Sequence, residues 1–353
     1  MGHASAIPLR NIWLLFLYAA DLVEYRDRFQ GEIESARDLP DLVGRLLACV
    51  VEARLRRNLS RGYRPHLAVL SRVRGRIDTL TTETGRLMER GQVACRFEDY
   101  TMNTARNRLV RAALERLATR ISDPNAAHRC RVLSGDFARL GVAAARPSRT
   151  ELAMDQIGRN ETADRLMVSL ARMVFDVVIP TETTGANELQ NSTPGEQLLR
   201  HLFERAVGNA LRLTLVPRGW SVTQGRRLRW PMTSASAGIA AVFPGMQTDI
   251  ELFHRLTDRR IVIDTKFTSI FTASNYRSEM LKSGYLYQMY AYLRTQERPD
   301  DPHSVVSEGM LLHPQVGGAV DEEVQIQGHM MRFKTIDMTS KPAEFESSLL
   351  GLL

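Results

Sequence analysis

Two apolar segments that carry acidic residues constrain the fold of this chain more than any other feature. Residues 248–252 (Thr-Asp-Ile-Glu-Leu) and 261–267 (Ile-Val-Ile-Asp-Thr-Lys-Phe) flank the polar stretch 256–260, which is typical of a turn. Residues such as Ile and Val favour strands, so the pattern predicts an antiparallel hairpin. In such a hairpin Asp249 and Asp264 can approach each other across the two strands.

The second strand is expected to carry two opposite charges on one face. Side chains alternate along a strand, so Val262, Asp264 and Lys266 share a face, with Asp264 and Lys266 about 6.6 Å apart at Cα. A charge on an apolar strand is costly unless it is paired or binds a metal. The pair could be an ordinary half-exposed ion pair at a sheet edge, or it could be catalytic.

Two carboxylates and a lysine are the groups that metal-dependent phosphodiester hydrolysis requires. Carboxylate oxygens bind Mg²⁺, which lowers the pKa of its bound water and polarises a phosphate. A lysine is a compact point charge that can neutralise the charge that develops on the phosphate. Of 47 basic residues 43 are arginines, and position 266 is nonetheless a lysine. We therefore expect a Mg²⁺-dependent centre at Asp249, Asp264 and Lys266.

The order of predicted elements along the 353 residues favours an α+β fold with two domains. In the first part we expect helices at 9–27, 39–59, 104–121 and 126–140, and a β-rich section at 64–100. After the polar segment 181–194 we expect helices at 194–215, 278–296 and 343–352, and strands near 220, 251, 264, 311, 325 and 333. This predicts an N-terminal mixed helix/β domain at 1–160, a helix and linker at 161–192, and a three-layer α/β domain at 193–353.

Motifs spread over nearly the whole chain together resemble one nuclease family. They are Pro244–Ile250, Ile261–Phe267 and Leu286–Leu293, together with Ile7–Ile12, Arg74–Asp78 and Asn103–Leu109. The set resembles the PD-(D/E)xK nuclease superfamily and, within it, the McrC family, the nuclease subunits of McrBC modification-dependent restriction systems. One departure is that Thr248 stands before Asp249, where the superfamily name has a proline.

The resemblance implies a role for each residue that matches a family motif. The metal ligands would be Asp249, Asp264 and the backbone carbonyl of Thr265, and Lys266 would be the catalytic lysine. Many superfamily members add an acid from the preceding helix, and here the candidate is Glu204. A solvent-facing helix glutamate is the alternative interpretation of Glu204.

Two further residues match the pattern of a helix that borders the site in many members of the superfamily. Gln288 and Tyr292 are separated by one helical turn, which places them on the same helix face. The resemblance implies that both belong to the catalytic site. Ordinary helix packing explains the same spacing equally well.

The resemblance also implies a partner, a hexameric McrB-like AAA+ GTPase whose hydrolysis this subunit stimulates. The β-rich section 64–100 would project toward that ring. Alternation would place Arg72, Arg74 and Arg76 on one strand face for partner binding. A solvated strand face and a contact to the DNA backbone are the alternatives. The sequence has no GxxxxGK[ST] motif, so GTP would be bound by the partner.

The resulting hypothesis is the Mg²⁺-dependent endonuclease subunit of a GTP-dependent complex that cuts double-stranded DNA containing 5-methylcytosine. A net charge of +7 suits a polyanionic substrate. Two other hypotheses stay open: a non-catalytic activator of the AAA+ ring, and a stand-alone repair nuclease of the same superfamily.

Other site classes lack sequence support. The three cysteines, Cys49, Cys95 and Cys130, are widely spaced and indicate neither a zinc site nor a disulfide framework. The eight histidines show no HxxxH or HExxH spacing. The apolar stretch 12–23 is shorter than the roughly 20 residues that a transmembrane helix needs. We expect a cytoplasmic protein without a membrane partner.

Overall fold

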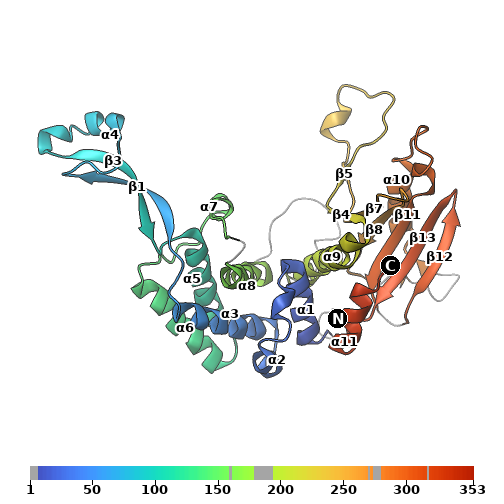
Figure 1. The fold of residues 1–353 in the computed structure, drawn as a ribbon, viewed down its shortest axis with the longest axis horizontal. Coiled ribbons are helices and arrows are strands. Elements are labelled where there is room, and N and C mark those ends of the chain that lie inside the picture. The colour runs from blue at the N-terminus through green and yellow to red at the C-terminus, as the bar shows by residue number, and fades with distance from the viewer. Residues whose placement is uncertain (1–6, 159–160, 179–193, 269–270, 273–279, 316–317) are drawn as a thin grey trace. The chain divides into compact units, whose positions relative to one another are not determined.

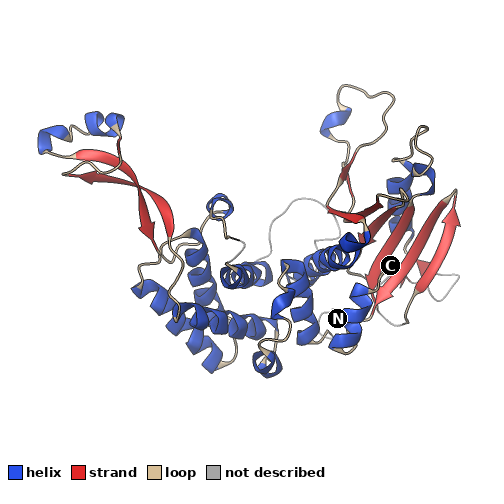
Figure 2. Cartoon of the chain, in the orientation of Figure 1, coloured by secondary structure: helices blue, strands red, loops and turns tan. Residues whose placement is uncertain are grey.

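The computed structural model describes residues 7–158, 161–178, 194–268, 271–272, 280–315 and 318–353. Helices and several sheets alternate along the chain, which confirms the predicted α+β class (Figure 2). The chain forms two compact units, one of Met1–Arg28 with Glu182–Leu353 and one of Phe29–Thr181. No helix in the described ranges is both long and apolar enough to cross a bilayer. The predicted linker at 181–193 lies outside the described residues.

The unit Phe29–Thr181 is built on helices that pack against one another. Its four long helices begin where the apolar periodicity begins, and side-chain caps fix the starts of three of them. Asp38, Thr104 and Asp123 each accept a hydrogen bond from a backbone N–H of the first turn. The helices are α2 (Gln30–Ser35), α3 (Leu39–Leu55), α4 (Thr79–Thr84), α5 (Ala105–Ala118), α6 (Pro124–Arg139), α7 (Arg149–Met154) and α8 (Thr162–Val178).

A three-stranded sheet extends from the helices of this unit (Figure 1). Its strands are β1 (Gly62–Leu70), β2 (Arg76–Ile77) and β3 (Val93–Thr101), in the order β1-β3-β2. No residue of β1 is buried. Residues 62–101, which comprise β1, β3 and the segment between them, are called here the β1–β3 hairpin. Large apolar side chains are exposed along it, among them Tyr63, Leu67, Val73, Leu80, Met88 and Tyr100. A surface of this kind is typical of a protein interface.

The prediction that Arg72, Arg74 and Arg76 share a strand face is wrong. β1 ends at Leu70 and only Arg76 lies in β2, so the three arginines are spread over a bend and a short strand. The bend requires Gly75, which has φ +68° and where a Cβ would lie 2.5 Å from the backbone oxygen of Arg96. Arg74 pairs with Asp99 at 3.2 Å. All three side chains are nevertheless exposed.

The larger unit contains a six-stranded mixed sheet in the order β12-β13-β11-β8-β7-β4. Strands β8, β11 and β13 are parallel, and the other neighbours are antiparallel. The strands are β4 (Trp220–Gln224), β7 (Ile250–His254), β8 (Arg260–Thr265), β11 (Glu308–Pro314), β12 (Asp321–Ile326) and β13 (His329–Ile336). Two short ribbons accompany the sheet, β5 (Arg227–Leu228) with β6 (Met246–Gln247) and β9 (Phe271–Thr272) with β10 (Met280–Leu281).

Four helices belong to this unit: α1 (Leu9–Ala20), α9 (Pro194–Leu215), α10 (Ser283–Arg294) and α11 (Pro342–Leu350). α10 packs on β8 and β11, and α9 packs on β4. The close approach of α10 to β11 depends on Gly309, where a Cβ would lie 2.7 Å from the sulfur of Met289. Val262, Tyr292, Leu293 and Phe333 belong to the apolar core on this face of the sheet.

The N-terminal helix belongs to the larger unit, and this differs from the predicted domain division 1–160, 161–192 and 193–353. α1 packs against α9 and α11. Asn11 is buried, and its side-chain amide donates to the backbone oxygens of Met338 and Ser340, 2.8 and 2.9 Å away. The amide of Asn209 donates to the oxygen of Tyr18 at 2.8 Å. Buried amides need such partners, so these bonds tie residues 7–20 to the distant C-terminal half.

The division also differs at residues 162–178. Helix α8 packs against α3 and α5, inside the smaller unit. Asp164 is buried and pairs with Arg54 at 2.6 Å and with Arg106 at 3.4 Å. A buried carboxylate is stable only with such partners. This segment is therefore part of a domain core and not a connection between domains.

Candidate active site

The two acidic strands form the predicted hairpin. β7 and β8 are antiparallel, with Ile250 opposite Ile263 and Glu251 opposite Val262. Continuing this register by one residue places Asp249 opposite Asp264. Residues that face each other in an antiparallel pair are about 4.5 to 5.5 Å apart at Cα and project to the same face. The hairpin therefore brings the two aspartates together at one end of the central strands.

The carboxylate of Asp249 is held in place by the adjacent strand. Its Oδ2 accepts hydrogen bonds from the backbone N and the hydroxyl of Thr265, at 2.7 and 2.9 Å. These bonds form beyond the last ladder pair of β7, because Asp249 precedes the first residue of that strand. The side chain of Asp249 thus accepts the hydrogen bonds that a further backbone pair of β7 and β8 would make, and both of these bonds go to Oδ2.

Asp264 and Lys266 form a buried ion pair and not an exposed pair at a sheet edge. β8 lies between β7 and β11, and Asp264 is 1% exposed. Its Oδ2 forms an ion pair with Lys266 Nζ at 3.0 Å, and neither of its carboxylate oxygens has a hydrogen-bond partner among the described residues. Burial, followed by the negative charge of Asp249, raises the pKa of Asp264 to about 7. One lysine does not fully compensate two neighbouring carboxylates.

The ammonium group of Lys266 stays charged in this environment. Burial alone would lower the pKa of Lys266, but the adjacent Asp264 and the nearby Asp249 raise it above its ordinary value. Nζ also lies 5.2 Å from the centre of the Tyr285 ring, within the range of a cation–π contact. The site therefore holds a fixed positive point charge beside two acids.

Glu204 lies on α9 in a partly buried position that faces the same acids. Burial, and then the charges of Asp249 and Asp264, raise the pKa of Glu204 to about 7. A glutamate in open solvent would not sense those carboxylates in this way. Glu204 is therefore not a fully solvent-facing glutamate, and its role in the site stays a prediction.

The donor set suits a hard divalent cation, although it is not a closed cage. Among the described residues, no three His, Cys, Asp or Glu side chains lie close enough to hold a metal ion. The fit depends on the carboxylate oxygens of Asp249 and Asp264. Those of Asp264 are buried and have no hydrogen-bond partner among the described residues. Mg²⁺ is usually bound through one or two carboxylates, with waters and phosphate completing the coordination. The residues present therefore fit Mg²⁺.

Gln288 and Tyr292 are joined to each other and to Gln247 at the end of β6, two residues before Asp249. The amide of Gln288 donates to the Tyr292 hydroxyl at 2.6 Å, and that hydroxyl donates to the backbone oxygen of Gln247 at 2.7 Å. Tyr292 is also buried in the core beneath α10. Tyr292 thus packs in the core and also holds the segment that leads into Asp249, and the role of the pair in catalysis stays a prediction.

Three residues near Lys266 were not singled out from the sequence. They are Lys282, Tyr285 and His313. The ring of Tyr285 contacts Lys282 as well as Lys266, with Lys282 Nζ 5.4 Å from the ring centre. The centres of the Tyr285 and His313 rings are 5.7 Å apart. His313 is buried, and burial lowers its pKa to about 4, so it is neutral at pH 7. Its Nδ1 donates to the backbone oxygen of Thr268 at 2.8 Å. No local motif marks these residues, because they meet only through β11 and α10.

Glu251 is a further acid on the Asp249 face, and strand alternation could have identified it. It is buried and pairs with Arg260 at 2.7 Å and closely with Arg226. Two arginines neutralise it, whereas Asp249 and Asp264 share one lysine. Because of this difference in pairing, we interpret Glu251 as a structural carboxylate and Asp249 and Asp264 as the ones available for a cation.

The raised pKa of Asp264 predicts an unusual pH dependence of stability in the absence of metal. In the unfolded chain this carboxyl ionises near its ordinary pKa, about 4, but in the folded chain it holds its proton to about pH 7. Between these values the folded state binds more protons, so the free energy of unfolding falls as pH rises. We expect the stability of the wild type relative to Asp264→Asn to fall by on the order of 2 kcal/mol from about pH 5 to pH 8.

Urea unfolding in EDTA at several pH values measures this difference. His313 acts in the opposite direction, because its pKa is lowered on folding, but this contribution is present in both proteins and cancels. A difference that is constant or rises with pH would show that Asp264 is not an uncompensated buried acid.

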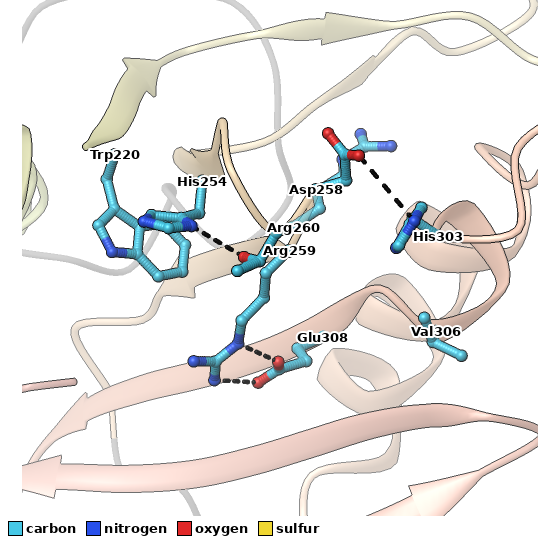
Figure 3. Close-up of a pocket in the computed structure, with 9 residues that line it drawn as sticks. Trp220, His254, Asp258, Arg259, Arg260, His303, Val306 and Glu308 are labelled. Atoms are coloured by element: carbon cyan, nitrogen blue, oxygen red, sulfur yellow. Dashed lines mark hydrogen bonds and ion pairs between the residues drawn. The ribbon is translucent and has the colours of Figure 1, made fainter. Parts of the chain in front are cut away.

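A hollow lies at the end of these strands that is opposite the candidate site, and Figure 3 shows the residues that line it. It has a volume of about 460 Å³ and is lined by Trp220, His254, Arg259, His303 and Glu308, among others. Arg259 and Glu308 form two bonds at 2.5 and 2.9 Å, and His254 contacts Thr257 at 2.8 Å. These polar groups satisfy one another. Arg260 is four residues, or about 13 Å, from Asp264 along β8, so the hollow is separate from the candidate site.

Comparison with solved structures shows proteins of similar fold. The chain is similar to a solved Thermococcus gammatolerans structure described as McrB AAA+ hexamers with bound McrC. The TM-score is 0.51 at 13% identity, over 96% of this chain and 76% of that one. It is also matched to a Thermococcus gammatolerans McrBC complex, with a TM-score of 0.35 and 14% identity over 58% of this chain and 59% of that one. Curated protein sequences gave no match.

The family comparison covers most of the sequence. The model of the family described as "McrBC 5-methylcytosine restriction system component" matches residues 9–306. This range includes the motifs of α1, the β1–β3 hairpin, the acidic strands and α10. It confirms at the level of the family the resemblance drawn from the sequence motifs. The chain belongs to the McrBC 5-methylcytosine restriction system component family.

Proposed function

We propose that this chain is the McrC-type subunit of an McrBC system and that its larger unit is a PD-(D/E)xK endonuclease domain. The observation that carries the proposal is the register of β7 and β8, whose continuation by one residue places Asp249 opposite Asp264, beside the ammonium of Lys266. Asp264 is buried with an oxygen that lacks a partner among the described residues. A buried charge of this kind costs stability, and a cation that binds phosphate would offset that cost.

The proposed metal ligands are Asp249, Asp264 and the backbone carbonyl of Thr265. Glu204 on α9 is proposed as a further ligand that would move toward the ion when the metal binds, because the three acidic side chains do not lie close enough together in the described residues. Bound Mg²⁺ would lower the pKa of a water and polarise the scissile phosphate of double-stranded DNA. The chain's own contribution is to hold these groups in position before substrate arrives. Thr265 fixes Asp249 by two hydrogen bonds, which leaves little reorganisation for the reaction.

Lys266 is the proposed catalytic lysine. Its Nζ is fixed between Asp264 Oδ2 at 3.0 Å and the Tyr285 ring. From there an ammonium can neutralise negative charge that develops on the phosphate, or orient the attacking water. Gln288 and Tyr292 complete the proposed site by holding the Gln247 carbonyl, two residues before Asp249. They act on the position of the acid and not on the phosphate.

The proposed partner is an McrB-like AAA+ GTPase hexamer, which would bind GTP and recognise 5-methylcytosine. The exposed apolar side chains of the β1–β3 hairpin support a protein-binding surface in the smaller unit. Arg72, Arg74 and Arg76 belong to the segment that follows β1, in which Arg76 pairs with Arg96 of β3, and they are proposed to take part. On this proposal the subunit both cuts DNA and stimulates its partner's GTP hydrolysis.

A reconstitution tests the proposal. The full chain is incubated with the AAA+ GTPase encoded beside it, Mg²⁺, GTP, and either methylated or unmethylated duplex DNA. Cutting that requires all three of GTP, Mg²⁺ and methylation is expected. Cutting by the chain alone would favour a stand-alone nuclease, and GTPase stimulation without any cutting would favour a non-catalytic activator.

A further inference from the structure

A basic arm stands directly before the catalytic strand. It comprises Gly225–Gln247 and is called here the β5–β6 arm. Figure 1 shows it as the yellow loop that rises from β5 beyond the sheet. Its base is a two-stranded ribbon in which Arg227 pairs with Gln247 and Leu228 with Met246. Leu228 and Met246 are buried in the same core as Tyr292.

The arm is connected to the candidate site through its base. Gly225 N donates to the backbone oxygen of Asp249 at 2.9 Å, and Thr248 N donates to the oxygen of Arg226 at 3.0 Å. The side chain of Gln296 donates to the oxygen of Arg229 at 3.1 Å. A rigid base of this kind fixes the direction of the arm relative to Asp249. A polymer whose backbone lies at Asp249 and Asp264 must therefore pass close to the arm.

The charge of the arm is of one sign. Gly225–Gln247 contains three arginines and no aspartate or glutamate, in a chain that has 40 acidic residues among 353. Arg226 is neutralised by Glu251. Arg227 and Arg229 are exposed, and their side chains have no ion pair in the described part of the chain. Two uncompensated guanidinium groups beside an acid-free loop complement a polyanion.

The outer part of the arm is apolar and exposed. Val242 is 76% exposed and Met232 is 51% exposed, and Phe243 packs against Trp230 with ring centres 5.5 Å apart. The indole Nε1 of Trp230 donates to the oxygen of Pro244 at 2.8 Å, which closes the loop on itself. Apolar side chains on a basic arm are a combination that proteins insert into DNA grooves, where arginines contact phosphates and apolar groups contact sugars and bases.

We propose that the β5–β6 arm binds duplex DNA next to the cut site, with Arg227 and Arg229 on backbone phosphates and Met232, Val242 and Phe243 in a groove. The inference rests on the proposed nuclease function, because that function places the scissile phosphate at Asp249 and Asp264. It adds a substrate contact that the catalytic motifs do not contain. The arm would orient the duplex and hold it against the metal site.

Binding of a labelled DNA duplex to the full chain, measured by fluorescence anisotropy in EDTA, tests the arm without cutting. We expect Arg227→Ala/Arg229→Ala to weaken binding at least about tenfold at low salt. The slope of log affinity against log salt should become shallower by about 1.8, or roughly 0.9 for each phosphate that an arginine no longer neutralises. Val242→Ser/Phe243→Ser should weaken binding with little change in that slope, since those side chains carry no charge.

The matched control is Arg218→Ala/Arg255→Ala, which removes two exposed arginines from the other end of the same sheet. We expect this control to bind within about twofold of the wild type, because its charges are far from the proposed path of the DNA. If the arm variant binds as tightly as the wild type, the proposal is overturned. If the arm variants keep DNA binding but fail to stimulate the partner's GTP hydrolysis, the arm contacts protein instead, and the proposal is equally overturned.

Failure of the arm proposal is distinguishable from failure of the nuclease proposal. If the arm variant binds DNA with wild-type affinity and the wild-type complex cuts methylated DNA, only the arm proposal is refuted. If the wild-type complex does not cut DNA, the nuclease proposal is refuted, whatever the DNA affinity of the arm variant.

Discussion

Asp264→Asn is expected to abolish DNA cutting by the reconstituted complex, with a loss of at least about 10²- to 10³-fold. The amide has the shape of the acid but cannot supply the negative oxygen that the proposed cation needs. The change should leave the fold intact, because Asp264 is a buried acid whose pKa is raised to about 7, so its charged form destabilises the folded chain. In metal-free buffer near pH 8 the variant should unfold at a higher temperature than the wild type.

The matched control is Asp321→Asn, which removes an acid from the exposed edge strand β12 of the same sheet. Its cutting rate should equal that of the wild type. Both variants should stimulate the partner's GTP hydrolysis normally, since that function is assigned to the smaller unit. Undiminished cutting by Asp264→Asn would show that Asp264 has no catalytic role.

Lys266→Arg is expected to lower the cutting rate by about 10²-fold even though the positive charge is kept. The ammonium fits between Asp264 Oδ2 and the Tyr285 ring, in a largely buried position. A guanidinium is longer and planar, and it would pair with Asp264 through two nitrogens. That pairing would occupy the carboxylate oxygen that the cation requires.

Lys334→Arg provides the comparison, because Lys334 also lies in the sheet and pairs with an acid, Asp321, at 3.4 Å. It should cut at the wild-type rate. Single-turnover cutting assays under saturating partner and GTP distinguish the chemical step from assembly. Equal rates for Lys266→Arg and Lys334→Arg would mean that any positive charge suffices at position 266, or that none is needed.

The local pattern of the sequence was sufficient to predict the hairpin and the approach of Asp249 to Asp264, but not the pairing of individual residues. Strand alternation around Val262 and Asp264 and the polar turn at 256–260 bring the two acids toward each other, and continuing the register of the structure places them opposite each other. Helix α9 begins and ends at the predicted residues, Pro194 and Leu215. The start predicted for α10, Ser278, lies outside the described residues, and the described helix begins at Ser283. These elements follow from local periodicity and from residues that favour or break helices.

Long-range packing was not predictable in the same way. The apolar faces of α1 and α8 indicate that each helix is buried, but not against which partner. The position of α1 is set by Asn11 and Asn209, whose partners are 327 and 191 residues away in the sequence. Likewise the bend at Gly75 breaks the alternation that the three arginines were expected to follow. A single sequence shows the hydrophobic periodicity of a segment, whereas the elements that the segment packs against depend on the whole fold.

The candidate site shows the same division. Motifs identify Asp249, Asp264 and Lys266, which are close in sequence. His313 and Tyr285 come from β11 and α10, and only the parallel pairing of β8 with β11 brings them near Lys266. Glu251 satisfies the same alternation rule as Asp249 but is neutralised by Arg226 and Arg260. The sequence pattern cannot distinguish a paired acid from one that is available to a cation.

Binding of Mn²⁺ to the full chain, followed by the decrease of its free-ion EPR signal, tests most directly whether the two aspartates share a cation. Mn²⁺ accepts the same oxygen ligands as Mg²⁺, and it reports binding without any cutting. We predict a site that is present in the wild type, weakened strongly in Asp264→Asn and unchanged in Asp321→Asn. Equal Mn²⁺ binding by all three proteins would contradict a shared cation at Asp249 and Asp264.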